Sequence, residues 1–168
     1  MDDPFQTIDI VLGLKDYKVP SMILSPTQWE AYQIDIELSW NPVRFDAMHL
    51  NSIPADQKGV YSFIVQPSIA QHPLCAYLLY VGKVEKQVFR ERYKQYLKEQ
   101  QKDYRNARRV HVTRMLQKWK NHLWFCYAPV DDDQLIGQIE DALLAAYLPS
   151  HNREFPASIR KDRAAALE

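Results

Sequence analysis

The sequence is poor in features that mark several specialised classes of protein. It has two cysteines, Cys75 and Cys126, and no Cys-x-x-Cys pair, which argues against a zinc site or a disulfide framework and favours two buried, reduced thiols. No run approaches eighteen apolar residues, so we expect no membrane span. The N-terminus carries neither the basic region nor the apolar segment of a secretory signal, so we expect a cytoplasmic protein.

Glycine is also scarce. The chain has four, and both Gly59 and Gly82 border strand-like runs, where a missing side chain indicates close approach of another group. The remaining composition is ordinary: 168 residues, 46% hydrophobic and 25% charged, suit a globular domain that buries its core without a metal or a disulfide.

The formal net charge of zero hides an uneven distribution. Residues 83–122 hold thirteen Lys and Arg against four Asp and Glu, a balance of +9, while residues 1–82 carry −5 and residues 123–168 carry −4. A basic cluster of this density is typical of proteins that bind phosphate backbones. The alternative is a pair of solvated helices with no ligand.

Hydrophobic periodicity predicts an α+β domain with the order β-β-α-α-β-α, its sheet covered or sandwiched by helices. A further short helix is expected from Ser25 through Ile36, because Ser-Pro-Thr-Gln is a good N-terminal signal. We expect strands at 59–66, 75–81 and 122–130, and helices at 87–101, 106–120 and 131–148.

Two charged residues fall on helix faces that are otherwise apolar. Glu140 lies within the apolar arc of the last helix, and Arg92 within that of the helix at 87–101, with Arg90 at its edge. They either pair with each other or flank a pocket. With Tyr61 and Tyr80 on the neighbouring strands, they make a plausible phosphoryl-transfer site, in which a carboxylate binds a hard cation and a guanidinium neutralises developing charge.

These motifs resemble the GIY-YIG endonuclease superfamily over residues 57–155. The two halves of the signature are Gly59-Val60-Tyr61 and Tyr80-Val81-Gly82, with Val in place of Ile, and the connection at 67–74 is longer than in compact members. The other matching elements, in order, are Lys83, Arg92 with Tyr96 four residues on, Glu140, and Asn152 after Pro149.

The resemblance implies a small three-stranded antiparallel sheet flanked by helices, and divalent-metal hydrolysis of phosphodiester bonds in DNA, with RNA left open. Glu140 would bind the Mg²⁺ or Mn²⁺ ion. The domain would span 57–155, after an N-terminal extension at 1–56 and before a tail at 156–168 whose end looks vector-derived. The alternatives are a non-catalytic nucleic-acid-binding module on the same fold, and a structural or partner-binding domain whose Arg92–Glu140 pair is only a buried ion bridge.

The resemblance also implies roles. Tyr61 would be the general base or would position water, with Tyr80 as its partner, and its pKa near 10 must then be lowered by Lys83, Arg92 or the metal. Arg92 would stabilise the transition-state phosphate, and Arg90 is the alternative if the helix register differs. Tyr96 would support the site or donate to the leaving group, and Asn152 would hold the final loop or contact the site. The residues expected to contact nucleic acid are Lys83, Arg90, Lys94, Lys98, Arg105, Arg108, Arg109, Arg114 and Lys118.

Overall fold

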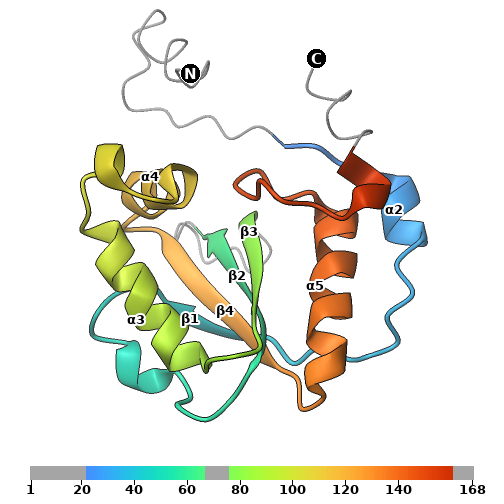
Figure 1. Ribbon diagram of the computed structural model, residues 1–168, viewed down its shortest axis with the longest axis horizontal. Coiled ribbons are helices and arrows are strands. Elements are labelled where there is room, and N and C mark those ends of the chain that lie inside the picture. Colours follow the sequence, from blue (N-terminus) through green and yellow to red (C-terminus); the bar gives the residue numbers. More distant parts are fainter. Residues whose placement is uncertain (1–21, 67–75, 161–168) are drawn as a thin grey trace, which may run out of the picture.

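The computed structural model describes residues 22–66 and 76–160 and shows an α+β architecture (Figure 1). One antiparallel sheet has the strand order β1-β4-β2-β3, with α3 and α4 on one face and α5 on the other. The elements are α2 (Pro26–Glu30), β1 (Asn41–Arg44), the 3₁₀ turn η1 (Leu50–Ser52), β2 (Gly59–Val65), β3 (Tyr77–Val84), α3 (Phe89–Gln100), the 3₁₀ turn η2 (Tyr104–Asn106), α4 (Val110–Lys118), β4 (Leu123–Pro129) and α5 (Asp133–Tyr147).

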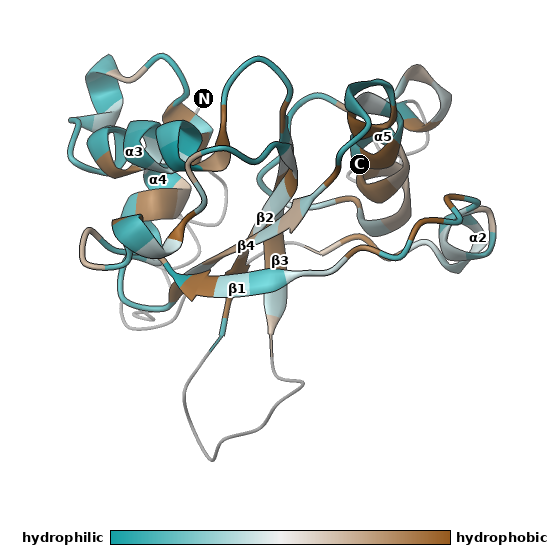
Figure 2. Ribbon diagram, turned by 90° about the horizontal axis from the view of Figure 1, so that it is seen from below, coloured by the Kyte–Doolittle hydropathy of each residue, from teal (hydrophilic) through white to brown (hydrophobic). Residues whose placement is uncertain are grey.

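Strand β2 lies between β4 and β3, and its nearly continuous apolar run fits a strand that is covered on both faces. Alternation along the strand sends Tyr61, Phe63 and Val65 to the core beneath α3 and α4, and Val60 to the core beneath α5. Figure 2 shows that the helices beside the sheet contain both hydrophobic and hydrophilic residues, as expected for helices that bury one face. The predicted order β-β-α-α-β-α is confirmed from β2 onward.

The sheet has four strands, so the expected three-stranded sheet is wrong. Strand β1 pairs antiparallel with β4 and covers the edge that a three-stranded sheet would leave open. It comes from the segment that we assigned to an N-terminal extension. The residues that follow β1 also belong to the domain, because Phe45 and Ile53 are buried in the core beneath α3. Pro42 and Arg44 interrupt the apolar pattern of β1, which is why periodicity did not reveal this strand.

The helix expected from Ser25 to Ile36 is also shorter than predicted, because α2 ends at Glu30. The Ser25 side chain makes no capping hydrogen bond. Beyond the helix, Tyr32 and Ile34 are partly buried on alternate positions against the α5 core, a spacing that fits extended chain rather than helix.

The other predicted elements are present with shifted ends. Helix α4 begins at Val110 instead of residue 106, because η2 precedes it and is capped by the Asp103 carboxylate. Within the described residues, no helix is long and apolar enough to cross a bilayer. Cys126 is a buried free thiol. Cys75, the connection at 67–74 and the chain beyond residue 160 lie outside the described residues.

Candidate active site

Three tyrosine side chains meet on the α3 side of the sheet. Tyr61 comes from β2, Tyr80 from β3 and Tyr96 from α3, and the hydroxyl oxygens of Tyr61 and Tyr96 are 2.7 Å apart. The rings of Tyr61 and Tyr80 stack with their centroids 6.4 Å apart. Tyr61 and Tyr96 are fully buried, whereas Tyr80 is partly exposed. The cluster therefore reaches the surface at Tyr80.

Gly82 makes room for this cluster. It lies opposite Tyr61 in the β2–β3 register, and a Cβ atom at this position would sit 2.5 Å from the Tyr61 hydroxyl and 3.0 Å from the Tyr80 ring. Gly59 is needed for a different reason, since its φ of +144° is a conformation that L side chains rarely adopt. A Cβ at Gly59 would also clash with the Ala128 carbonyl oxygen, so both glycines mark close approaches, as their placement in the sequence indicates.

Two guanidinium groups flank the tyrosines, and neither has a carboxylate partner within 4.0 Å in the described part of the chain. The half-buried Arg109 packs its guanidinium over the Tyr96 ring, 5.2 Å from the centroid. Arg92 is held by neutral amides. It donates to Gln95 Oε1 at 3.2 Å. With the Gln87 amide oriented so that its oxygen faces Arg92, the guanidinium also donates to that oxygen at 2.8 and 2.9 Å. Both cations remain able to take an anion.

Arg90, the alternative to Arg92, is committed elsewhere. Its Nε donates to the Ile53 carbonyl at 2.7 Å and its Nη2 to the Asn51 carbonyl at 3.3 Å. It therefore ties α3 to the η1 turn, whereas the charge of Arg92 acts on Tyr61. Of the two arginines, Arg92 is the one placed at the cluster.

Tyr61 and Tyr80 are harder to ionise than free phenols. Burial, with the neighbouring Tyr96 and Tyr80, raises the pKa of Tyr61 well above 10, although Arg92 acts to lower it. Burial and Tyr96 likewise raise the pKa of Tyr80, against the opposing charge of Arg109. Arg92 therefore does not by itself lower the pKa of Tyr61 as a general base would require, because desolvation outweighs the nearby cation. These hydroxyls are hydrogen-bond donors at neutral pH.

Glu140 faces inward from α5, on the opposite face of the sheet from the tyrosines, and its partner is Lys83. Lys83 Nζ lies 3.4 Å from Glu140 Oε2 and 2.9 Å from Glu85 Oε1. Burial raises the pKa of Glu140 while Lys83 acts to lower it. The Arg92–Glu140 ion bridge that we considered is therefore wrong. The charge of Glu140 still acts on Tyr80, which lies on the edge strand β3 together with Lys83.

The donor set near Glu140 fits a hydrated cation. No group of three or more His, Cys, Asp or Glu side chains gathers to hold a metal in residues 22–66 and 76–160. Mg²⁺, however, commonly keeps several water ligands and takes one or two carboxylates. Lys83 already bonds to Glu85, so Glu140 can turn to a cation without leaving that ammonium group unpaired. The carboxylate oxygens suit Mg²⁺ or Mn²⁺ rather than a softer metal.

Asn152 is a structural clamp on the free edge of β3. Its Oδ1 accepts from the Val81 amide at 2.9 Å and its Nδ2 donates to the Val81 carbonyl at 2.8 Å. The His151 amide adds a bond to the Leu79 carbonyl at 2.9 Å. Asn152 is buried and holds the final loop against the strand that carries Tyr80 and Gly82.

The expected nucleic-acid contacts lie on α3, η2, α4 and the residues just before α4, apart from Lys83 on β3. Lys94, Lys98, Arg105 and Arg108 are exposed, while Lys83, Arg90, Arg109, Arg114 and Lys118 are partly buried. Arg105 and Arg114 both lie over the Tyr104 ring, 5.9 and 4.9 Å from its centroid. Most of the basic +9 segment thus lies on α3, η2 and α4, beside Arg92 and Arg109.

The sequence did not reveal the positions of two charged residues, Arg109 beside the tyrosine cluster and Glu99 between α3 and α4. Arg109 was counted among the surface phosphate contacts, because it precedes α4 and no helical periodicity places it. Glu99 is a buried carboxylate that accepts from Thr113 at 2.7 Å and from Lys102 at 2.8 Å, which joins α3 to α4. The helical pattern of the sequence gave no reason to expect a buried acid there.

The chain was compared with protein-family models, curated proteins and solved structures, and none of the three comparisons finds a match.

Proposed function

We propose that this protein is a divalent-metal-dependent endonuclease of the GIY-YIG type that hydrolyses phosphodiester bonds in DNA. The observation that carries the proposal is the position of the Arg109 guanidinium over the Tyr96 ring, beside buried hydroxyls of which those of Tyr61 and Tyr80 stay protonated. The charge of Arg92 also acts on Tyr61, and neither arginine has a carboxylate partner among the described residues. The G-V-Y and Y-V-G motifs supply two of those tyrosines, Tyr61 and Tyr80.

A phosphodiester suits this arrangement chemically. A guanidinium group presents planar donors that match two phosphate oxygens. A half-buried cation such as Arg109 is costly without a counter-charge, and a bound anion would supply one. Phenols that stay protonated at neutral pH donate hydrogen bonds to an anionic oxygen and do not repel it. Together these groups favour an anionic phosphate over a neutral ligand.

Each residue then has a role in the proposed reaction. Arg92 and Arg109 neutralise charge on the phosphate, and the partly exposed Tyr80 is the phenol best placed to contact substrate. The buried Tyr61 orients the cluster through its hydroxyl contact with Tyr96 and is not itself the base. Glu140, which lies across the sheet from the two guanidinium groups, would hold a Mg²⁺ or Mn²⁺ ion beside the edge strand β3, where its charge acts on Tyr80. The bound ion would supply Lewis-acid stabilisation of the leaving oxygen.

The basic surface supports a polymeric nucleic-acid substrate. Exposed cations on α3, η2 and the approach to α4 extend away from the cluster, and Arg109 connects them to it. Such contacts with phosphates give salt-dependent affinity without reading base sequence. We therefore expect cleavage with low sequence specificity, directed by the shape of the nucleic acid.

A second candidate is a nucleic-acid-binding module that does not cleave. The Lys83–Glu140 ion pair favours it, because Lys83 occupies the carboxylate that a metal would need. The burial of Tyr61 favours it too, since no substrate water can reach that hydroxyl in this arrangement. This candidate predicts binding that is indifferent to the removal of Glu140.

One screen separates the two. Supercoiled plasmid, branched DNA, single-stranded DNA and RNA are incubated with the protein in Mg²⁺, Mn²⁺ or EDTA. The endonuclease should cut at least one substrate in either metal and none in EDTA, and Arg92→Ala, Arg109→Ala and Glu140→Ala should each reduce the rate by about 100-fold or more. The matched control is Gln138→Ala, an exposed change on the same helix as Glu140, which should cut normally.

Each contrary result has a distinct meaning. Binding without cutting on every substrate would favour the second candidate. Cutting that persists in Glu140→Ala, or in EDTA, would overturn the proposed use of the metal. Loss of cutting in Gln138→Ala would show that the helix variants act through folding.

A further inference from the structure

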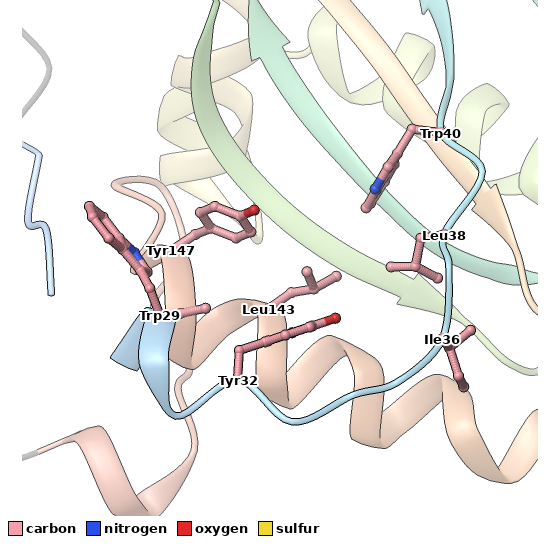
Figure 3. Close-up of a pocket in the computed structure, with 8 residues that line it drawn as sticks. Trp29, Tyr32, Ile36, Leu38, Trp40, Leu143 and Tyr147 are labelled. Carbon is pink, nitrogen blue, oxygen red and sulfur yellow. The ribbon is translucent and has the colours of Figure 1, made fainter. Parts of the chain in front are cut away.

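An open groove of about 560 Å³ lies between α5 and the N-terminal segment that carries α2, away from the tyrosine cluster (Figure 3). The Trp29, Tyr32 and Tyr147 side chains stand on one side and the Leu38 and Trp40 side chains on the other (Figure 3). The buried Leu143 contributes from α5. This set of residues is called the aromatic groove below.

The aromatic groove leaves large side chains in water. Trp29 is 45% exposed, Trp40 38% and Tyr147 53%. A cluster of exposed large apolar side chains marks a binding surface more often than chance, and Trp and Tyr are the residues that most often carry binding energy at protein interfaces. The groove has the composition of a site that is covered by a ligand or a partner.

The N-terminal wall of the aromatic groove is acidic. Residues 22–43 contain Glu30, Asp35 and Glu37 and no Lys or Arg, and all three acids are exposed. Helix α5 also lacks Lys and Arg; its Asp133 pairs with Lys58 and its Glu140 with Lys83, while its Asp141 is exposed. Arg153 and Arg160 lie on the segment that follows α5, and Arg160 is bound to the Phe155 carbonyl. The walls therefore favour a ligand of positive charge.

We propose that the aromatic groove binds a basic peptide segment of a partner protein, one that carries apolar anchor side chains between its Lys or Arg residues. The aromatic rings would take the apolar anchors and also attract the cations that lie over their faces. The acids on the walls would pair with the remaining cations and steer the peptide into place.

Two other occupants fit less well. A second copy of this chain, packed face to face on the same groove, would bring the exposed acids of the two N-terminal segments together, which is unfavourable. The chain's own N-terminal residues 1–21 hold two Lys and four Asp, a balance of −2, so they lack the charge that the walls favour.

The test uses the full chain and two synthetic probes. One is a fluorescently labelled twelve-residue peptide of lysine and leucine in amphipathic order, and the other replaces every lysine by glutamate. Anisotropy should show saturable binding of the lysine peptide, with affinity at least about tenfold weaker for the glutamate peptide. Tyr147→Ala and Glu37→Lys should each weaken the lysine peptide by about tenfold.

Matched variants outside the groove are the controls. Met48→Ala removes another exposed apolar side chain and Glu91→Lys reverses another exposed acid, and both should bind as the wild type does. Equal binding of the two peptides, or equal losses in the groove variants and the controls, would overturn the proposal. Sedimentation that shows a dimer, lost in Tyr147→Ala and without peptide binding, would also overturn it in favour of a second copy as occupant.

Discussion

Replacing Gly82 by alanine should damage the tyrosine cluster directly. The new Cβ would lie 2.5 Å from the Tyr61 hydroxyl oxygen and 2.6 Å from its ring carbon Cζ. Tyr61 has little room to retreat, because its ring packs 5.2 Å from the Phe125 ring and 6.4 Å from the Tyr80 ring. Moving it would also break its hydroxyl contact with Tyr96.

The expected cost follows from these contacts. Overpacking a filled core costs about 1–3 kcal/mol, and a buried hydroxyl left without a partner costs about 1–3 kcal/mol more. The free energy of unfolding should therefore fall by about 2–6 kcal/mol, which for a chain of this length lowers Tm by roughly 4–24 °C. Urea and thermal unfolding followed by circular dichroism measure both quantities.

Gly137→Ala is the matched control. Its Cβ would meet the end of the Lys83 side chain at 3.2 Å and that of Glu85 at 3.3 Å, and both ends are flexible. Because Gly137 lies inside α5, alanine should be neutral or should stabilise the helix by up to about 1 kcal/mol. A Gly82→Ala protein as stable as the wild type would refute the placement of Tyr61 against β3.

Three further predictions concern Asn152, Tyr93 and Arg108. Asn152→Ala should lower the free energy of unfolding by about 2–4 kcal/mol, because it leaves the buried amide and carbonyl of Val81 unpaired; a change below 0.5 kcal/mol, about the effect of an ordinary surface substitution, would contradict the clamp. Burial raises the pKa of Tyr93 to about 12, so as the pH rises the unfolded state loses this proton before the folded state does. The free energy of unfolding should therefore fall between about pH 10 and 12, and it should fall less in Tyr93→Phe. Unfolding measured at each pH tests this. Arg108→Ala should reduce the slope of log K against log salt for DNA binding by about one, whereas an unchanged slope would remove Arg108 from the interface.

Strands β2 and β4 and the tyrosine motif follow from local pattern, whereas β1 does not. Apolar runs bounded by Gly59 and Pro129 predict β2 and β4 closely, and the spacing of Tyr61, Tyr80 and Gly82 in their motifs predicts a cluster at the sheet. These features depend on neighbours in the sequence and on strand pairing, which a single sequence expresses well.

Long-range partners do not follow from such patterns. The helical periodicity of α5 predicts that Glu140 faces inward, but it does not show that Glu140 pairs with Lys83 rather than with Arg92. Arg109 precedes α4 and carries no periodic signal, although the fold brings it over the Tyr96 ring. The pKa direction of Tyr61 depended on how completely the fold desolvates it, which no motif reveals.

Nicking of supercoiled plasmid by the wild type and by Glu140→Gln, run side by side in Mg²⁺, tests the proposed endonuclease most directly. Gln keeps the size of the side chain and removes the charge that would hold the ion. The proposal predicts nicking by the wild type, none by Glu140→Gln, and undiminished DNA binding by both. Equal nicking by the two proteins, or a wild type that binds DNA and never nicks it, would contradict it.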